Sequence, residues 1–300
     1  TEEDRRCLRL GAQWGVDLVA LSFVSSAQDI QEARRVLQEV GAPDVPVIAK
    51  IERAEALDRI DQIVQAADGL MVARGDLGVE IPQEEVPLVQ KELIARANAL
   101  GRVVITATQM LRSMVDSPRP SRAEVADVAN AVLDGSDALM LSEETAVGRW
   151  PVLTVRTMDA IVRAAERKAL QHPPFPCAPG RSIEEAISHA ACTMAHDLGA
   201  SLIVTPTESG ATARNVARWR PLPPILAISP WETTVRRLRI CWGVVPRRSD
   251  RFHHFDQMME EARRLALRSG MAAPGHIVVF TAGLPVGTRG ATNLIKAERL

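Results

Sequence analysis

The sequence contains no tyrosine and only five phenylalanines, and aromatic residues make up 3% of its 300 residues. Proteins that stack nucleic-acid bases depend on aromatic rings, so this scarcity argues against such a protein. The formal net charge of −1 also argues against a coat for nucleic acid, because a coat needs a large excess of basic side chains. We therefore expect no nucleic-acid partner.

Long apolar runs are absent as well, and the N-terminus has no signal-peptide pattern. The four cysteines are scattered without a C-x-x-C pair, which is typical of free thiols in a reducing compartment. These features predict a cytoplasmic protein with no membrane partner. The chain opens at Thr1 rather than Met, which indicates a processed chain or a fragment.

Lysine is scarce, since only four of the thirty-six basic residues are Lys. One of them, Lys50, lies near the end of the apolar segment 45–51 and is followed by Glu52. Side chains in a strand alternate between faces, so Lys50 and Glu52 point the same way. An ammonium group at a strand end is costly to desolvate unless an anion meets it. This lysine is therefore a candidate functional residue.

A second apolar segment, 69–73, also ends in charge, with Arg74 and Asp76. Glu52 and Asp76 at the ends of neighbouring strands would suit a divalent cation that prefers oxygen ligands. An ammonium group beside such a metal favours phosphoryl transfer or the stabilisation of an enolate. The simpler interpretation is an ion-pair network at a sheet end, and the residues alone leave both open.

Residues 1 to about 170 alternate between apolar strands and amphipathic helices. Near-continuous apolar strands are typical of a parallel sheet buried on both faces. The expected strands are 17–24, 45–51, 69–73, 103–107 and 138–141, and the expected helices include 27–40, 54–66, 122–133 and 151–170. Polar residues follow the strands at Ser22, Lys50, Asp76, Thr108 and Glu143, where α/β proteins place their active sites. Because a closed β/α barrel needs eight such units, five units predict an open sheet or a partial barrel.

The Pro-rich segment 171–180 predicts a linker between two domains, at 1–172 and 181–300. The second part again alternates helices with strands, which predicts a smaller α/β sheet domain. Its expected strands are 201–205, 225–228, 244–245, 276–281 and 292–298, and its expected helices are 183–198, 211–219, 232–242 and 255–270.

Several segments together resemble the pyruvate kinase family, and the resemblance covers essentially the whole chain. The segments are 48–52, 71–82, 105–111, 119–130, 141–146, 205–221 and 281–293. The family transfers the phosphoryl group of phosphoenolpyruvate to ADP, which gives pyruvate and ATP. The resemblance implies a (β/α)8 TIM barrel of which this chain carries strands four to eight, followed by a C-terminal α/β regulatory domain. It also implies that the first three strands and an inserted lid domain are absent.

Matched motif by motif, the resemblance implies roles for individual residues. Lys50 matches the catalytic lysine that faces the transferred phosphoryl group, and Glu52 and Asp76 match the ligands of Mg²⁺ or Mn²⁺. Thr108 matches a catalytic threonine near the enolate carbon, implicated in its protonation. Ser22 lies at the matching end of the first strand present here.

The backbone of Ala73, Arg74 and Gly75 matches the part of the family that binds the substrate carboxylate. The resemblance also implies K⁺, whose Asn/Ser/Asp site would lie outside this chain. Glu143 departs from the family pattern, which has Gly or another small residue there. A carboxylate at this position would either disfavour anionic ligands or point into solvent.

The resemblance further implies a phosphorylated allosteric effector in the second domain. Its expected contacts are Thr207, Ser209, Thr212 and Arg289, since hydroxyl groups before a helix can bind an anion. An ordinary helix cap is the competing interpretation. The family implies subunit interfaces in 118–130 and in the C-terminal domain, and hence a homotetramer.

Two other functions remain as alternatives. Lys and carboxylates at barrel strand ends with a metal would also suit a 2-keto-acid aldolase, whose intermediate is likewise an enolate of pyruvate. The second alternative is a non-catalytic module for effector binding or oligomerisation, because five-eighths of a barrel leaves open sheet edges.

Overall fold

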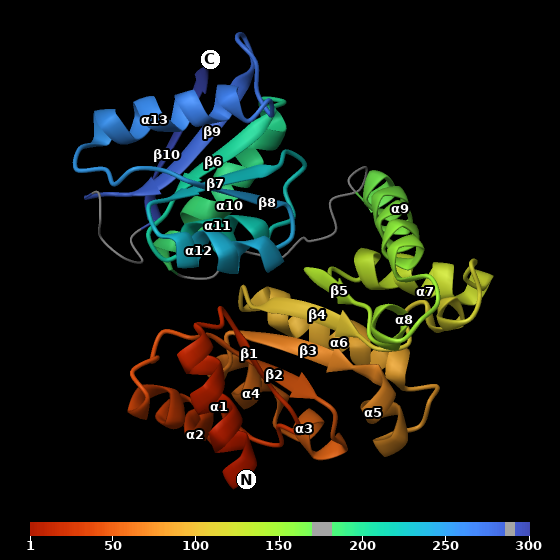
Figure 1. The fold of residues 1–300 in the computed structure, drawn as a ribbon. Coiled ribbons are helices and arrows are strands. Elements are labelled where there is room, and N and C mark those ends of the chain that lie inside the picture. The colour runs from red at the N-terminus through yellow and green to blue at the C-terminus, as the bar shows by residue number, and fades with distance from the viewer. Residues whose placement is uncertain (170–181, 286–291) are drawn as a thin grey trace. The chain divides into compact units, whose positions relative to one another are not determined.

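The structure is a computed structural model and describes residues 1–169, 182–285 and 292–300. The chain divides into two compact units, Thr1–Gln171 and His172–Leu300, which are drawn in Figure 1. The predicted linker at 171–180 lies outside the described residues. Each unit is built around one mostly or wholly parallel β-sheet.

Unit 1 begins with a helix whose sequence encodes its own start. The hydroxyl of Thr1 accepts from the N–H of Asp4, and three acidic residues occupy the first turn. The elements of its first half are α1 (Glu2–Trp14), β1 (Val19–Leu21), α2 (Ala27–Glu39), β2 (Val47–Ile51), α3 (Ala54–Asp58), α4 (Ile60–Ala66) and β3 (Gly69–Ala73). The predicted helix 54–66 is thus two helices that break at Arg59.

The second half of unit 1 contains a short helix that the sequence analysis did not predict. This helix, α5 (Arg74–Glu80), follows β3 directly and is anchored by the fully buried side chain of Leu77. The remaining elements are α6 (Val86–Ala99), β4 (Val103–Ala107), the 3₁₀ helix η1 (Arg112–Val115), α7 (Arg122–Leu133), β5 (Ala138–Met140), α8 (Glu143–Ala146) and α9 (Pro151–Ala169).

The five strands of unit 1 form a parallel sheet in chain order, β1-β2-β3-β4-β5. Chain order is the order of strands in a β/α barrel. The main core lies between the sheet and its helices and includes Val47, Ala49 and Ile51 of β2. Because strand residues alternate, Ile48 and Lys50 face the opposite side of the sheet. Gly69 allows close strand packing, since a Cβ there would lie 2.7 Å from the carbonyl oxygen of Val103.

Unit 2 is a smaller α/β unit with strand order β10-β9-β6-β7-β8. Its strands are parallel except β10, which pairs with β9 in the antiparallel sense. The elements are α10 (Ile183–Asp197), β6 (Leu202–Pro206), α11 (Ala211–Ala217), β7 (Ile225–Ser229), α12 (Glu232–Arg237), the 3₁₀ helix η2 (Leu238–Ile240), β8 (Val244–Arg248), α13 (Phe255–Arg268), β9 (Ile277–Gly283) and β10 (Thr292–Arg299).

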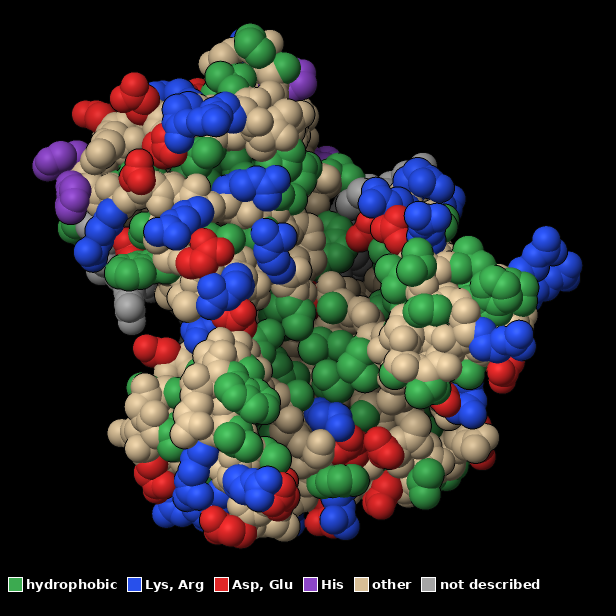
Figure 2. Space-filling model, viewed as in Figure 1, with side chains coloured by type: hydrophobic (Ala, Val, Ile, Leu, Met, Phe, Trp, Pro, Cys, Tyr) green, Lys and Arg blue, Asp and Glu red, His purple; other side chains and the backbone are tan. Residues whose placement is uncertain are grey.

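Three further features bear on the sequence-based expectations. Among the helices that the structure describes, none is long and apolar enough to span a membrane. On the face drawn in Figure 2, basic and acidic side chains are interspersed over each unit rather than segregated by sign. Cys7, Cys192 and Cys241 are not disulfide-bonded within the described residues, and burial raises the pKa of Cys192 to about 12.

Candidate active site

Lys50 and Glu52 form an ion pair at the carboxyl end of β2. Lys50 Nζ lies 2.6 Å from Glu52 Oε1 and donates a hydrogen bond to Ser22 Oγ at 3.0 Å. The Glu52 side chain is 1% exposed, whereas that of Lys50 is 24% exposed. The structure therefore brings together three residues that the sequence analysis placed at two neighbouring strand ends, with a solvent-accessible ammonium above a buried carboxylate.

The second oxygen of Glu52 fixes the end of β1. Glu52 Oε2 accepts from the N–H of Phe23 at 2.6 Å, and Phe23 has a φ of 54°. A non-glycine residue with positive φ is strained and persists only where its surroundings hold it. Glu52 thus connects β1 to β2 while it faces Lys50.

Asp76 lies in the first turn of α5 rather than at the end of a strand. Ile51 of β2 pairs with Val72 of β3, and the two strands are parallel neighbours. The carboxyl ends of both strands therefore lie at the same edge of the sheet. The Asp76 side chain is exposed, and no ion pair of Asp76 is found in the parts of the chain that the structure describes. A second carboxylate is thus accessible at this edge, carried by a helix.

Thr108 follows β4 directly and contacts the start of α5. Its Oγ1 accepts from the N–H of Gly75 at 2.8 Å and donates to the carbonyl of Ala107 at 2.6 Å. A Cβ on residue 75 would make only ordinary contact with Thr108, 3.4 Å from its Oγ1. The N–H of Gly75, expected to bind a substrate carboxylate, is here occupied by Thr108.

The side chain of Arg74 points into unit 1 and is 8% exposed. Its Nη2 donates to the carbonyls of Thr108 at 2.8 Å and Gln109 at 3.3 Å, and its Nη1 lies 2.7 Å from Asp127 Oδ1. The expectation for Arg74 concerned its backbone only. The guanidinium itself hydrogen-bonds to the backbone of the segment after β4. Thr106, two residues before Thr108 in β4, is fully buried and hydrogen-bonded to Ser136 at 2.8 Å.

Glu143 and Glu144 begin α8, after β5, and have different environments. Glu143 forms an ion pair with Arg112 and is 39% exposed. Arg112 therefore balances the charge of Glu143. The sequence analysis expected this carboxylate either to disfavour anionic ligands or to point into solvent, and did not foresee the ion pair. Glu144 is 1% exposed and accepts from the N–H groups of Leu111 at 3.1 Å and Ser142 at 2.7 Å.

Comparison with known proteins shows the family of the chain. The family model for the pyruvate kinase barrel domain matches residues 1–155, and that for the pyruvate kinase alpha/beta domain matches 185–297. The chain belongs to the pyruvate kinase family. The predicted family resemblance and α/β fold class, with a barrel-type sheet followed by an α/β domain, are therefore confirmed.

Relatives named pyruvate kinase match nearly all of this chain. The protein of Geobacillus stearothermophilus is 48% identical over 302 residues, which is 99% of this chain and 51% of that protein. Those of Clostridium acetobutylicum and Mycobacterium tuberculosis are 43% and 45% identical and are covered over 64% and 63% of their lengths. The chain thus spans about half to two thirds of the length of these pyruvate kinases.

Membership of the pyruvate kinase family implies a metal requirement, and the residues present suit a particular kind of cation. Within residues 1–169, 182–285 and 292–300, no three His, Cys, Asp or Glu side chains form a metal-binding cluster. Two carboxylates at one sheet edge suit Mg²⁺ or Mn²⁺, which commonly takes one or two carboxylates and completes its shell with water and substrate oxygens. Glu52 and Asp76 therefore fit the group.

Of the predicted effector residues that the structure describes, Ser209 is exposed, Thr207 is half-buried and Thr212 is buried. Thr207 Oγ1 accepts from the N–H of Gly210, and the buried Thr212 hydroxyl pairs with that of Thr292 at 2.8 Å. Arg214 donates to the carbonyl of Ser209, and Arg289 lies outside the described residues. This loop is thus stabilised by its own hydrogen bonds, as an ordinary turn is.

Two groups at the barrel site were missed by the sequence analysis, the guanidinium of Arg74 and the carboxylate of Glu144. Both are charged groups in an otherwise apolar interior, and each hydrogen-bonds to backbone groups of the segment after β4. No local pattern reveals a partner more than thirty residues away.

Proposed function

We propose that this chain carries part of the site that transfers the phosphoryl group of phosphoenolpyruvate to ADP, as in glycolysis. The observation that carries the proposal is the exposed Lys50 ammonium above the buried Glu52 carboxylate, with Ser22 as a second partner. Asp76 and Thr108 follow the next two strands. This arrangement supports substrate positioning and charge neutralisation, which are the main requirements of phosphoryl transfer.

Lys50 is the proposed catalytic cation. Its ammonium is held by Glu52 and Ser22 but keeps an accessible side, so it can approach an anionic phosphoryl group. Lysine binds phosphate as a compact point charge that follows a moving group. Because Glu52 is buried, Lys50 stays near the sheet edge even before substrate arrives.

Glu52 and Asp76 are the proposed ligands of Mg²⁺ or Mn²⁺. The cation would supply Lewis-acid stabilisation of negative charge on the substrate oxygens. The chain's own contribution is a buried, preoriented Glu52 and an exposed Asp76 that is free to adjust. We propose K⁺ as a further cofactor of the full-length enzyme, on the family resemblance alone.

Thr108 is the proposed residue at the enolate carbon. Its hydroxyl hydrogen is directed at the carbonyl of Ala107, and its oxygen accepts from Gly75. To deliver a proton to the enolate carbon, the Thr108 hydroxyl would have to turn away from the carbonyl of Ala107. If the N–H of Gly75 binds the substrate carboxylate together with the backbone of Ala73 and Arg74, Thr108 is released from Gly75 and free to turn.

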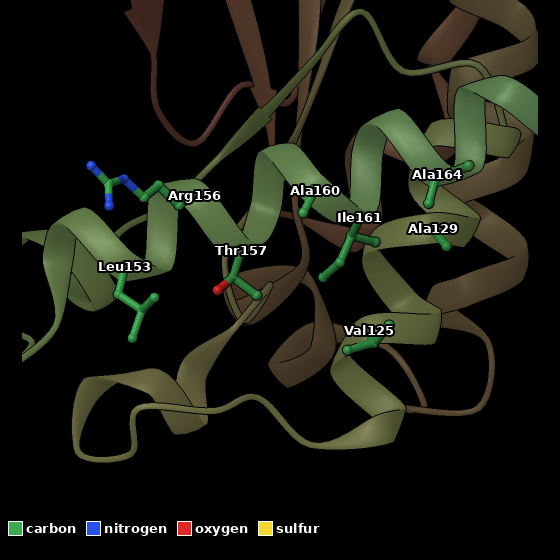
Figure 3. Close-up of a pocket in the computed structure, with 9 residues that line it drawn as sticks. Val125, Ala129, Leu153, Arg156, Thr157, Ala160, Ile161 and Ala164 are labelled. Atoms are coloured by element: carbon green, nitrogen blue, oxygen red, sulfur yellow. The ribbon is translucent and has the colours of Figure 1, made fainter.

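We also propose that the protein is a cytoplasmic homo-oligomer, a tetramer by family resemblance. Support comes from an apolar groove of about 540 Å³ between α7 and α9, shown in Figure 3. It is lined by Val125, Ala129, Leu153, Ala160, Ile161 and Ala164. Exposed apolar grooves are typical of protein–protein contacts. Leu153→Glu should lower the oligomeric state in sedimentation, whereas Glu143→Gln should not.

For unit 2 we propose a phosphorylated effector, with Thr207, Ser209, Thr212 and Arg289 as its residues. The support is the family resemblance and the hydroxyl groups of this loop. Calorimetry with a panel of phosphorylated sugars and nucleoside monophosphates tests it, and the absence of heat across the panel would contradict it.

The catalytic proposal is tested by pyruvate formation from phosphoenolpyruvate and ADP with Mg²⁺ and K⁺, together with Mn²⁺ binding by electron paramagnetic resonance. We expect Lys50→Ala to lower turnover at least about 100-fold, the usual loss for a charge at the transition state. Glu52→Gln should weaken Mn²⁺ binding about 10-fold or more. Lys91→Ala is the control, because Lys91 pairs with Asp134 on the outer helices.

The binding measurement matters because the chain spans only part of its relatives. A folded chain with neither turnover nor Mn²⁺ binding contradicts the proposal, and so does full turnover in Lys50→Ala. A metal-dependent retro-aldol activity in place of pyruvate formation would favour the aldolase alternative.

A further inference from the structure

Two consecutive residues after β4 adopt a conformation that side chains disfavour. Thr108 has a φ of 68° and Gln109 a φ of 54°, and neither is glycine. Left-handed backbone costs free energy at such residues and is retained only when neighbouring groups hold it. The structure therefore has to contain contacts that stabilise this turn.

Arg74 supplies the first of these contacts. Its guanidinium is buried and donates from Nη2 to the carbonyls of both left-handed residues, Thr108 and Gln109. The other end of the same group is fixed by Asp127 at 2.7 Å and by Gln90 at 3.3 Å. One planar cation thus connects α6 and α7 to the strained turn.

Glu144 supplies the second contact. One carboxylate oxygen accepts from the N–H of Leu111, at the end of the turn, and the other accepts from Ser142 after β5. Hydrogen bonds to an ionised group are stronger than neutral ones. The segment 108–111 is thus held by a cation on its carbonyls and an anion on an N–H group.

We propose that Arg74 and Glu144 are positioning residues that together hold Thr108 in its left-handed conformation. The turn places Thr108 Oγ1 where it meets the N–H of Gly75. The consequence for catalysis rests on the proposed function of Thr108, whereas the positioning itself does not. Neither side chain touches the reacting groups, and both act through the backbone of residues 108–111.

The fork of the guanidinium is essential to this proposal. A lysine at position 74 would preserve the charge beside Asp127, but a single ammonium cannot also span the two carbonyls. Likewise, a glutamine at position 144 keeps one acceptor oxygen but presents an NH₂ group to one of the two backbone donors. These variants change the geometry with little change in volume.

Amide hydrogen exchange, followed residue by residue by NMR in the full chain, tests the proposal. The N–H groups of Gly75 and Leu111 report directly, because the first is protected by Thr108 Oγ1 and the second by Glu144. We expect Arg74→Lys to speed exchange at both amides by about tenfold or more, as for a local opening that has lost a charged hydrogen bond.

Arg34→Lys is the matched control. Arg34 in α2 also bonds both a carboxylate, that of Asp68, and a backbone carbonyl, that of Ala66. Neither partner belongs to the turn after β4. Its substitution should leave Gly75 and Leu111 unchanged. If Arg74→Lys exchanges like the unsubstituted chain, Arg74 merely balances the charge of Asp127 and the proposal is wrong.

Glu144→Gln provides a second variant if Arg74→Lys does not fold. It should speed amide exchange at Leu111 or Ser142 directly, and at Gly75 through a looser Thr108. An unchanged exchange rate at Gly75 overturns the role of Glu144. A catalytic readout is separate. Where the unsubstituted chain turns over, both variants should lower kcat several-fold with little change in KM. A chain with neither turnover nor Mn²⁺ binding fails the proposed function and leaves the exchange result valid.

Discussion

The ammonium of Lys50 lies 2.6 Å from the carboxylate of Glu52, whose side chain is 1% exposed. Removing one partner of such a pair leaves a charge without compensation in the interior. We expect Lys50→Met to destabilise unit 1 by about 1–3 kcal/mol, below the full cost of a buried pair because Lys50 is partly exposed. Adding Glu52→Gln should recover most of the loss, as urea unfolding would show.

A double variant no more stable than Lys50→Met would contradict this interpretation. The pair would then owe its stability to packing of the lysine stem rather than to charge. Arg163→Met, which removes one partner of the exposed pair with Asp159 on α9, should cost little and serves as the control.

Glu298 should contribute an acid-sensitive part of the stability of unit 2. Its hydrogen bond to Arg263, aided by Lys296, lowers its pKa from 4.5 to about 2. A carboxylate with a lowered pKa stabilises the fold above its ordinary pKa, and this contribution is lost as the pH falls toward the folded value. The loss is therefore expected between about pH 4.5 and 2.

The measurement is the thermal midpoint against pH for the chain and for Glu298→Gln. The variant should be less stable at pH 6, and the difference should shrink as the pH approaches 2. Parallel curves over this range would show that the pair with Arg263 contributes nothing measurable.

Thr205 and Thr281 carry buried hydroxyls that find no hydrogen-bond partner among the described residues. Both are 0% exposed, on adjacent strands β6 and β9, one position beyond the paired Val204 and Phe280. Burial of an unpaired hydroxyl is unfavourable, and valine has nearly the same shape. We expect Thr205→Val and Thr281→Val to stabilise unit 2 by about 1 kcal/mol each in urea unfolding. Destabilisation by either would indicate that a water or ligand pairs the hydroxyls in solution.

Ser121 should act as the N-cap of α7. Its hydroxyl accepts from the N–H of Glu124, and the Glu124 carboxylate accepts in return from Ser121 and also from Ser113. Partial burial acts to raise the pKa of Glu124, but these hydrogen bonds outweigh it and lower the pKa. Ser121→Ala should cost about 1 kcal/mol of unfolding free energy, and Ser121→Thr should restore most of it because threonine keeps the acceptor.

Several elements were predictable because their signals are local. The strand 69–73 and the helix 122–133 were predicted with the bounds that the structure has, and the strand 103–107 likewise. Their apolar runs or capping boxes lie within one short segment. The predicted strand 17–24 is observed only at Val19–Leu21, since its ends do not pair with β2.

Helix α5 was missed because its sequence opposes it. Two glycines in seven residues, Gly75 and Gly78, disfavour a helix. Tertiary contacts override that preference, since Leu77 is fully buried and Arg74 is held by Asp127. The same contacts move Asp76 from a predicted strand end onto a helix.

The sequence by itself determined which residues follow the strands of unit 1, because alternation in a strand and the parallel course of β/α units are local rules. It thereby predicted Ser22, Lys50 and Glu52 as neighbours, as the structure shows. Only the tertiary structure decided where charged side chains turn inward. Arg74 meets Asp127 across 53 residues of chain, and Glu144 meets Leu111 across 33. Such contacts form when separate β/α units pack together, so no single segment encodes them.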